Sequence, residues 1–127
     1  MTLDPQSAPL DETLTALGVH RIPLPIPFAH AGGPINAYLI DDGDGRVAMI
    51  DTGLCTETCI AALQDGFAAA GKRVQDVSRV LITHGHVDHF GLARYVQDRS
   101  GAPVLVHPDL IRDRAGRVGP RSGFRGD

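Results

Sequence analysis

Apolar positions along the chain repeat with two different periods, and each period predicts its own kind of element. Over residues 56–70 they step by three and four positions, which places them on one face of a helix that Gly71 would end. A second helix is expected over residues 90–100, closed by Gly101. Short apolar runs between turn residues predict strands at 18–28, 35–40, 46–51, 80–83 and 103–106.

The order of these runs predicts an α/β fold. The run at 18–28 carries proline at every second position from Pro23, so it can form only an edge strand. The acidic, glycine-rich turn at 42–45 joins the next two runs as a hairpin. Strand, helix and strand follow one another between Val80 and Val106, and such a βαβ unit has parallel strands.

The chain has 127 residues, which is the length of one domain. Within it we expect a flexible lead-in at 1–17, a domain at 18–111 and a basic tail rich in glycine and arginine at 112–127, disordered in solution. The net charge of −3 is unevenly spread, because the tail holds five arginines against two aspartates while the rest is acidic. An acidic body makes nucleic acid an unsuitable partner.

Hydropathy and cysteine content set further limits. No apolar run approaches the roughly 18 residues that a membrane-spanning helix needs. The N-terminal segment has neither a basic cluster nor an apolar stretch, so no secretory signal is expected. Two cysteines cannot build a disulfide framework. We therefore expect a cytoplasmic protein without membrane contact.

Candidate chemistry is concentrated in one short segment at the end of the predicted strand 80–83. Its candidate ligands are His84, His86, Asp88 and His89. Imidazole nitrogen and carboxylate oxygen are the donors that zinc and neighbouring metals accept. Residues two apart in an extended chain point the same way, so His84 and His86 can share one metal. Asp88 and His89 follow at a turn and can face a second metal, so the segment predicts a metal site rather than a histidine-rich polar turn.

The run HGHVDH at 84–89 resembles the signature of the metallo-β-lactamase superfamily. Upstream, the block IDTG at 50–53 resembles the first block of that family. The Phe-Gly pair at 90–91 departs from the family's usual double glycine. The resemblance extends over about residues 18–110.

This resemblance implies a hydrolase in an αββα sandwich of two similar halves, with two metals, usually zinc, at one edge. By the same resemblance His84 and His86 bind the first metal, and Asp88 and His89 bind the second. Asp51 would steady the ligand loop by hydrogen bonding without binding metal itself. A hydroxide held between the metals would attack an acyl carbon or phosphorus, and Asp88 would be the catalytic residue that orients the water or receives its proton.

The ligands that the resemblance adds downstream are a later histidine, a bridging aspartate and a final histidine, and none has a match after His89. Catalytic zinc normally takes three protein ligands, whereas this segment supplies two for each metal. We therefore expect the N-terminal half of the sandwich, a mixed sheet with helices on one face. Its other face would be exposed, which favours self-association or a complementary half-domain as partner.

Other candidate ligands are weaker. His107 ends the last predicted strand on the same side of the sheet, and we expect it to line the pocket rather than bind metal. Cys55 and Cys59 stand four apart and could together grip one zinc. Buried thiols are common in helices, and this is the simpler interpretation of the pair.

The expected function is zinc-dependent hydrolysis of a small ester, thioester, lactone or lactam. One alternative is a metal-binding fragment or half-domain without turnover. Another is a mononuclear iron dioxygenase of the same fold, because the same ligand types can hold iron. The substrate stays open, since a fold alone does not fix a reaction.

Overall fold

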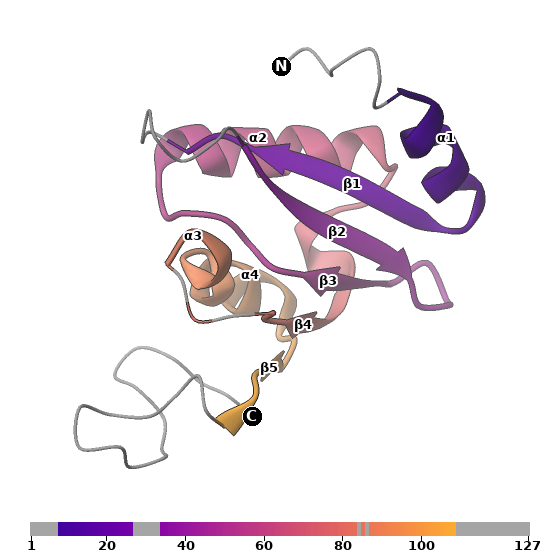
Figure 1. The fold of residues 1–127 in the computed structure, drawn as a ribbon. Helices are drawn as coiled ribbons and strands as arrows, with labels where there is room; N and C mark the ends of the chain where they lie inside the picture. The colour runs from indigo at the N-terminus through magenta and orange to yellow at the C-terminus, as the bar shows by residue number, and fades with distance from the viewer. Residues whose placement is uncertain (1–7, 27–33, 84, 86, 109–127) are drawn as a thin grey trace, which may run out of the picture.

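The computed structural model describes residues 8–26, 34–83, 85 and 87–108. These residues form one five-stranded sheet whose strands follow their order in the sequence (Figure 1). The strands are β1 (Val19–Leu24), β2 (Ile35–Asp41), β3 (Val47–Ile50), β4 (Val77–Leu81) and β5 (Val104–Leu105). The helices are α1 (Ala8–Ala16), α2 (Glu57–Ala69), the short 3-10 helix η1 (Val74–Asp76), α3 (Val87–Phe90) and α4 (Ala93–Ser100).

The sheet is mixed. β2 pairs antiparallel with both β1 and β3, and the second of these pairs is the predicted hairpin. The β3–β4 and β4–β5 pairs are parallel, which confirms the predicted βαβ unit. β1 lies at an edge, as its prolines require, with Pro23 opposite Asn36. Because β3, β4 and β5 run in the same direction, their carboxyl ends meet at one edge of the sheet, where the candidate site lies.

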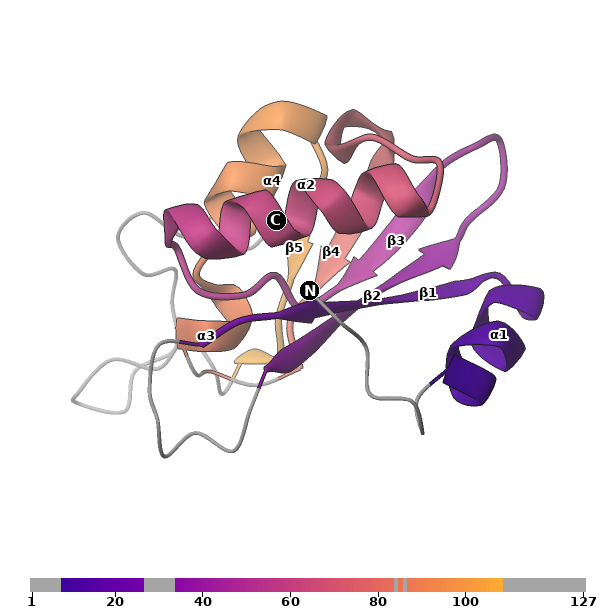
Figure 2. The same cartoon turned by 90° about the horizontal axis from the view of Figure 1, so that it is seen from above.

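One face of the sheet carries the hydrophobic core. Alternate strand residues point toward α2 and α4, which both lie over this face (Figure 2). Fully buried side chains come from α2 (Leu63, Phe67), from α4 (Val96) and from the sheet (Leu39, Met49). Burial of each such side chain stabilises the fold by about 1.5–3 kcal/mol. The structure therefore confirms a mixed sheet with helices packed on it, α2 and α4 both on one face.

Helix α2 agrees with its predicted span to within one residue at each end. The side chain of Thr56 caps its start by accepting a hydrogen bond from the backbone N–H of Cys59 at 3.1 Å. Gly71 follows its end with a φ of 71°, a left-handed conformation that suits glycine. Gly66 lets the helix lie close to β1, because a Cβ at this position would be 2.5 Å from Cγ2 of Ile22.

The second predicted helix is interrupted. α3 ends at Phe90 and α4 begins only at Ala93. Between them, the backbone N–H of Leu92 donates to Oγ1 of Thr52 at 3.0 Å and to the carbonyl of Gly53 at 3.2 Å. These hydrogen bonds to the loop after β3 replace a helical one, so tertiary contacts break a helix that the local sequence pattern would continue.

Strand β4 begins three residues earlier than predicted. The first half of the strand contains Ser78 and Arg79, which bind the carboxylate of Asp42 at 2.5 Å and 3.0 Å. This half therefore lacks the continuous apolar run on which the prediction depended. Thr83, expected as the last strand residue, lies two residues beyond the end of β4.

Within the expected lead-in at 1–17, residues 8–16 form helix α1, an element that the sequence pattern did not predict, while the flexibility of this segment stays a prediction. Asp11 on this helix accepts two hydrogen bonds from the guanidinium of Arg21 on β1, at 2.8 Å and 2.9 Å. This ion pair holds α1 beside β1, and it joins residues too far apart in sequence for a local pattern to show it.

The expected tail at 112–127 lies outside the described residues. Within the part of the chain that the structure describes, no helix is both long enough and apolar enough to span a bilayer.

Candidate metal centre

The candidate site begins with a buried carboxylate at the carboxyl end of β3. Asp51 is 4% exposed and has a φ of 60°, in the left-handed region that aspartate tolerates better than most residues. Gly53, two residues later, has a φ of 94°, and a Cβ there would be 2.8 Å from Cδ1 of Leu24. This sharp turn brings the loop after β3 against the loop after β4 and against α3.

The carboxylate of Asp51 accepts three hydrogen bonds. Oδ1 accepts from the backbone N–H of Thr83 at 2.8 Å, and Oδ2 accepts from the hydroxyl of Thr83 at 2.6 Å. Nδ1 of His89 lies 2.9 Å from Oδ2. The side chain therefore connects the loop after β4 to helix α3, on either side of the segment 84–88.

The Asp51–His89 contact sets the tautomer of the imidazole. An ionised carboxylate only accepts hydrogen bonds, so Nδ1 of His89 carries a proton and Nε2 has the lone pair. Histidines that bind metal usually donate their other ring N–H to a carboxylate or a carbonyl, which fixes the ring and raises its basicity. His89 has this arrangement, and its side chain is 16% exposed.

Thr52 holds the backbone of the same histidine. Its side chain and main chain both donate to the carbonyl of His89, the N–H at 2.7 Å and the hydroxyl at 3.0 Å. The Thr52 hydroxyl also accepts from the N–H of Leu92, and the residue is fully buried. Consecutive residues of one loop thus bind the ring and the carbonyl of His89.

The structure describes some of the predicted site residues fully, some only in their backbone and some not at all. The ring of His89 lies beside Asp51, as reported above, and the backbone of Asp88 belongs to α3. His84, His86 and the side chain of Asp88 lie outside what the structure describes. The predicted convergence of the four ligands therefore stays a prediction. Among the described side chains alone, no group of three or more histidines, cysteines, aspartates or glutamates is placed to hold a metal.

His107 follows the end of β5 and is exposed. Its place at the carboxyl end of a parallel strand is the one that the sequence predicts, and its part in lining a pocket stays a prediction. Thr52 and Thr83 were not singled out from the sequence. Their only signal is position, one directly after Asp51 and the other directly before His84.

The two cysteines differ. Cys59 is buried, and its thiol donates to the carbonyl of Pro25 at 2.9 Å, which confirms the interpretation as a buried thiol. Cys55 is exposed, so that interpretation is wrong for this residue. The reason is its position before Thr56, the cap of α2, so that it stands outside the buried face of the helix.

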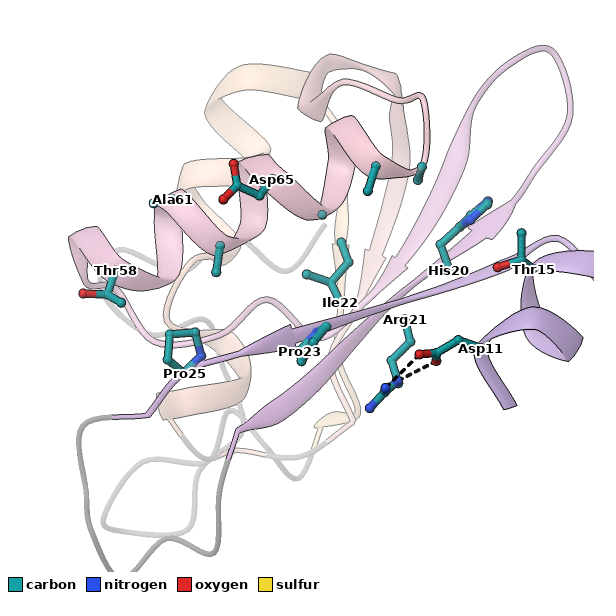
Figure 3. A pocket seen from close by; sticks show the side chains of 14 residues that line it. Asp11, Thr15, His20, Arg21, Ile22, Pro23, Pro25, Thr58, Ala61 and Asp65 are labelled. Carbon is teal, nitrogen blue, oxygen red and sulfur yellow. Dashed lines mark hydrogen bonds and ion pairs between the residues drawn. The ribbon is translucent and has the colours of Figure 1, made fainter. Parts of the chain in front are cut away.

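A separate groove of about 830 Å³ lies between α1, β1 and α2 (Figure 3). Small side chains of α2, Pro23 of β1 and Pro25 just after that strand line it, and so does the Asp11–Arg21 ion pair. Its described lining residues include neither Asp51 nor His89. The groove is therefore distinct from the candidate metal centre.

Comparison with known proteins bears directly on this site. The model of the metallo-beta-lactamase superfamily matches residues 30–126, which include both IDTG and HGHVDH. The chain belongs to the metallo-beta-lactamase superfamily. The family resemblance and the half-sandwich fold inferred from the sequence are therefore confirmed.

Similar proteins include the probable metallo-hydrolase YqjP of Bacillus subtilis, 36% identical over 67% of this chain and 25% of that protein. A metal-dependent hydrolase of Methylobacterium nodulans is 36% identical over 59% of this chain and 30% of that one. The crystal structure of the metallo-beta-lactamase family protein TTHA1429 from Thermus thermophilus matches with a TM-score of 0.65 and 36% identity, over 75% of this chain and 31% of that one. The chain spans about a quarter to a third of the length of these relatives.

Proposed function

We propose that this chain carries the first metal-binding block of a zinc-dependent hydrolase that acts on a small ester, thioester, lactone or lactam. The observation that carries the proposal is the buried Asp51 carboxylate bound to Nδ1 of His89. The hydrogen bond at Nδ1 fixes the ring and thereby the direction of the Nε2 lone pair. A surface histidine with no ligand role does not need such a bond. The names of two relatives, a probable metallo-hydrolase and a metal-dependent hydrolase, support the same chemistry.

The donor set fits zinc. In the proposal, His84 and His86 hold one ion and Asp88 and His89 hold a second, all through nitrogen and oxygen atoms. A bound zinc would supply hydroxide near neutral pH, because it lowers the pKa of its water to about 7.

The chain's own residues have separate tasks in this proposal. Asp51 keeps the proton of His89 on Nδ1 and joins that residue to Thr83 at the start of the ligand segment. Asp88 orients the attacking water or receives its proton, in addition to binding metal. A small-molecule substrate and a cytoplasmic location, both expected from the sequence, belong to the same proposal.

The ligands expected downstream of His89 have no match in this sequence. We therefore propose that the chain alone binds zinc without turnover, and that hydrolysis requires further ligands from a complementary part. The activity of the relatives is known only from the names of proteins of which this chain matches 25% and 30%, so it enters here as a proposal.

The test is metal analysis combined with a substrate panel. The chain is purified without added metal, analysed by mass spectrometry for zinc and iron, titrated with zinc and then incubated with thioester, lactone and β-lactam substrates. We expect zinc binding that His86→Ala weakens. One equivalent of iron in the purified chain would favour the dioxygenase alternative instead. Turnover by the chain alone, lost in His86→Ala, would show that no complementary part is needed.

A further inference from the structure

We propose that Thr52 is a positioning residue for His89, and that its hydroxyl fixes this histidine as a metal ligand. The inference rests on the proposed metal site, and it concerns a residue that binds neither metal nor substrate in that proposal. It starts from a buried hydroxyl that donates to the carbonyl of the candidate ligand His89 and accepts from the N–H of Leu92.

The hydroxyl of Thr52 has one hydrogen to donate, and it donates this hydrogen to the carbonyl of His89 at 3.0 Å. It accepts from the N–H of Leu92 at 3.0 Å. Thr52 is 0% exposed, so water cannot replace either bond. A buried polar group with both partners present defines one geometry, and losing the group leaves its partners underbonded.

The local helices explain why such a group is needed. α3 has only four residues, and the carbonyls at the end of a helix have no partner within it. α4 begins at Ala93, and the side chain of its N-cap residue, Leu92, makes no capping hydrogen bond. The Thr52 hydroxyl supplies a donor to the end of α3 and an acceptor to the start of α4, so it fixes the break between the two helices.

His89 is therefore held at two points by consecutive residues. Asp51 binds the ring at Nδ1, and Thr52 binds the carbonyl. A ring bound at one atom can still swing about that hydrogen bond when its backbone shifts. With the backbone fixed as well, Nε2 keeps one direction, which is what a metal ligand requires.

Thr52→Val removes the hydroxyl with little change of shape. The variant retains the hydrogen bond from the backbone N–H of residue 52 to the His89 carbonyl, and that from Leu92 to Gly53. The fold should therefore persist while the position of His89 loosens. We expect zinc affinity to fall by about tenfold, the lower end of the effect of losing an outer hydrogen-bond partner. Thr52→Ser keeps the hydroxyl and should return the affinity close to that of the parent chain.

The experiment has a readout that needs no metal. Nitrogen NMR of the histidine rings in the metal-free chain reports the tautomer and order of His89 in the parent, Thr52→Val and Thr52→Ser. Zinc affinity of the same proteins is then measured by competition with a chelator. Thr56→Val is the matched control, since it also removes a threonine hydrogen bond, the cap of α2, from outside the site.

Support for the proposal is a His89 ring signal that shifts or broadens in Thr52→Val, recovers in Thr52→Ser and is unchanged in Thr56→Val, together with the loss of zinc affinity. An unchanged ring signal in Thr52→Val would overturn the proposal, and so would parent-like zinc affinity in that variant. If the parent chain does not bind zinc, the proposed function fails, and the ring signals still decide whether Thr52 positions His89.

Discussion

Asp51 places a nearly buried charge where two loops and a short helix meet, and its three hydrogen bonds offset the cost of removing that charge from water. The sequence resemblance predicts that Asp51 supports the ligand loop by hydrogen bonding. It does not predict the partners Thr83 and His89, because these depend on how the loops after β3 and β4 approach in three dimensions. The role of Thr52 is hidden for the same reason.

Replacing Asp51 by asparagine tests the carboxylate itself. The amide retains one acceptor but places an NH₂ group where Oδ2 accepts from Thr83 and His89. We expect the free energy of unfolding to fall by about 1–3 kcal/mol, measured by urea denaturation. We also expect zinc affinity to fall by about 10- to 100-fold, measured by chelator competition.

Asp44→Asn is the matched control for this change. Asp44 also has a positive φ, 56°, but it is exposed in the turn between β2 and β3. Its replacement should change stability by less than about 0.5 kcal/mol and leave zinc affinity unaltered. Equal effects of the two substitutions would show that the Asp51 contacts do not matter.

Elements whose hydrophobic pattern is local were predictable. Helix α2 has a regular apolar face, a capping threonine and a terminal glycine, and its limits were predicted to within a residue. The first half of strand β4 and helix α1 were not, because each is held by a pair distant in sequence, Asp42 with Arg79 and Asp11 with Arg21. The break between α3 and α4 likewise depends on Thr52.

The close approach of α2 to β1 gives a prediction at this scale. In Gly66→Ala the new methyl group would meet the side chain of Ile22, so we expect a loss of about 1–3 kcal/mol despite the better helix propensity of alanine. Ile22→Ala alone should cost about 2–5 kcal/mol. In the double variant the space left by Ile22 accommodates the methyl group, so its cost should be smaller than the two single costs added together. Strict additivity in urea denaturation would contradict this packing.

The Asp11–Arg21 pair makes the docking of α1 sensitive to pH. The hydrogen bond and charge of Arg21 hold the pKa of Asp11 below its ordinary value, so the folded state favours the ionised carboxylate. This stabilisation is present above the unfolded pKa of about 3.9 and is lost as pH falls through the lower folded value. Parent and Arg21→Gln should therefore differ in stability by a constant amount above about pH 5, and the difference should shrink below about pH 4.

Urea denaturation at a series of pH values measures this difference. The control is Arg94→Gln, because Arg94 and Asp98 form an exposed ion pair on one turn of α4. Its removal should have little effect at any pH. A parent–Arg21→Gln difference that stays constant down to the lowest pH would contradict the proposed contribution of the ion pair.

On the scale of the whole molecule, the sheet has a second apolar row on the face opposite the core. Tyr38, Ile50, Leu81 and Leu105 are paired across four neighbouring strands. Ile40 and Leu105 are each 38% exposed. The family resemblance predicted an uncovered face of this kind, because it implies a sandwich of two halves and the sequence matches only the first. In agreement with this, the chain matches about a third of the TTHA1429 structure. What the sequence could not show is which side chains form it.

We expect the isolated chain to associate with itself through this face. The combined substitution Ile40→Lys and Leu105→Lys should shift the sedimentation coefficient toward that of the monomer. Leu17→Lys is the control, because Leu17 is 73% exposed and lies after α1 in none of the strands of the sheet. A parent chain that stays monomeric at its highest soluble concentration would contradict the expectation.

The most direct test of the proposed metal centre is X-ray absorption at the zinc edge of the zinc-loaded chain. Ligands from His84, His86, Asp88 and His89 predict nitrogen and oxygen neighbours at about 2.0–2.2 Å, with the multiple-scattering pattern of imidazole. His89→Ala should reduce that imidazole pattern. Sulfur neighbours at about 2.3 Å would place the metal at Cys55 and Cys59 instead and contradict the assignment.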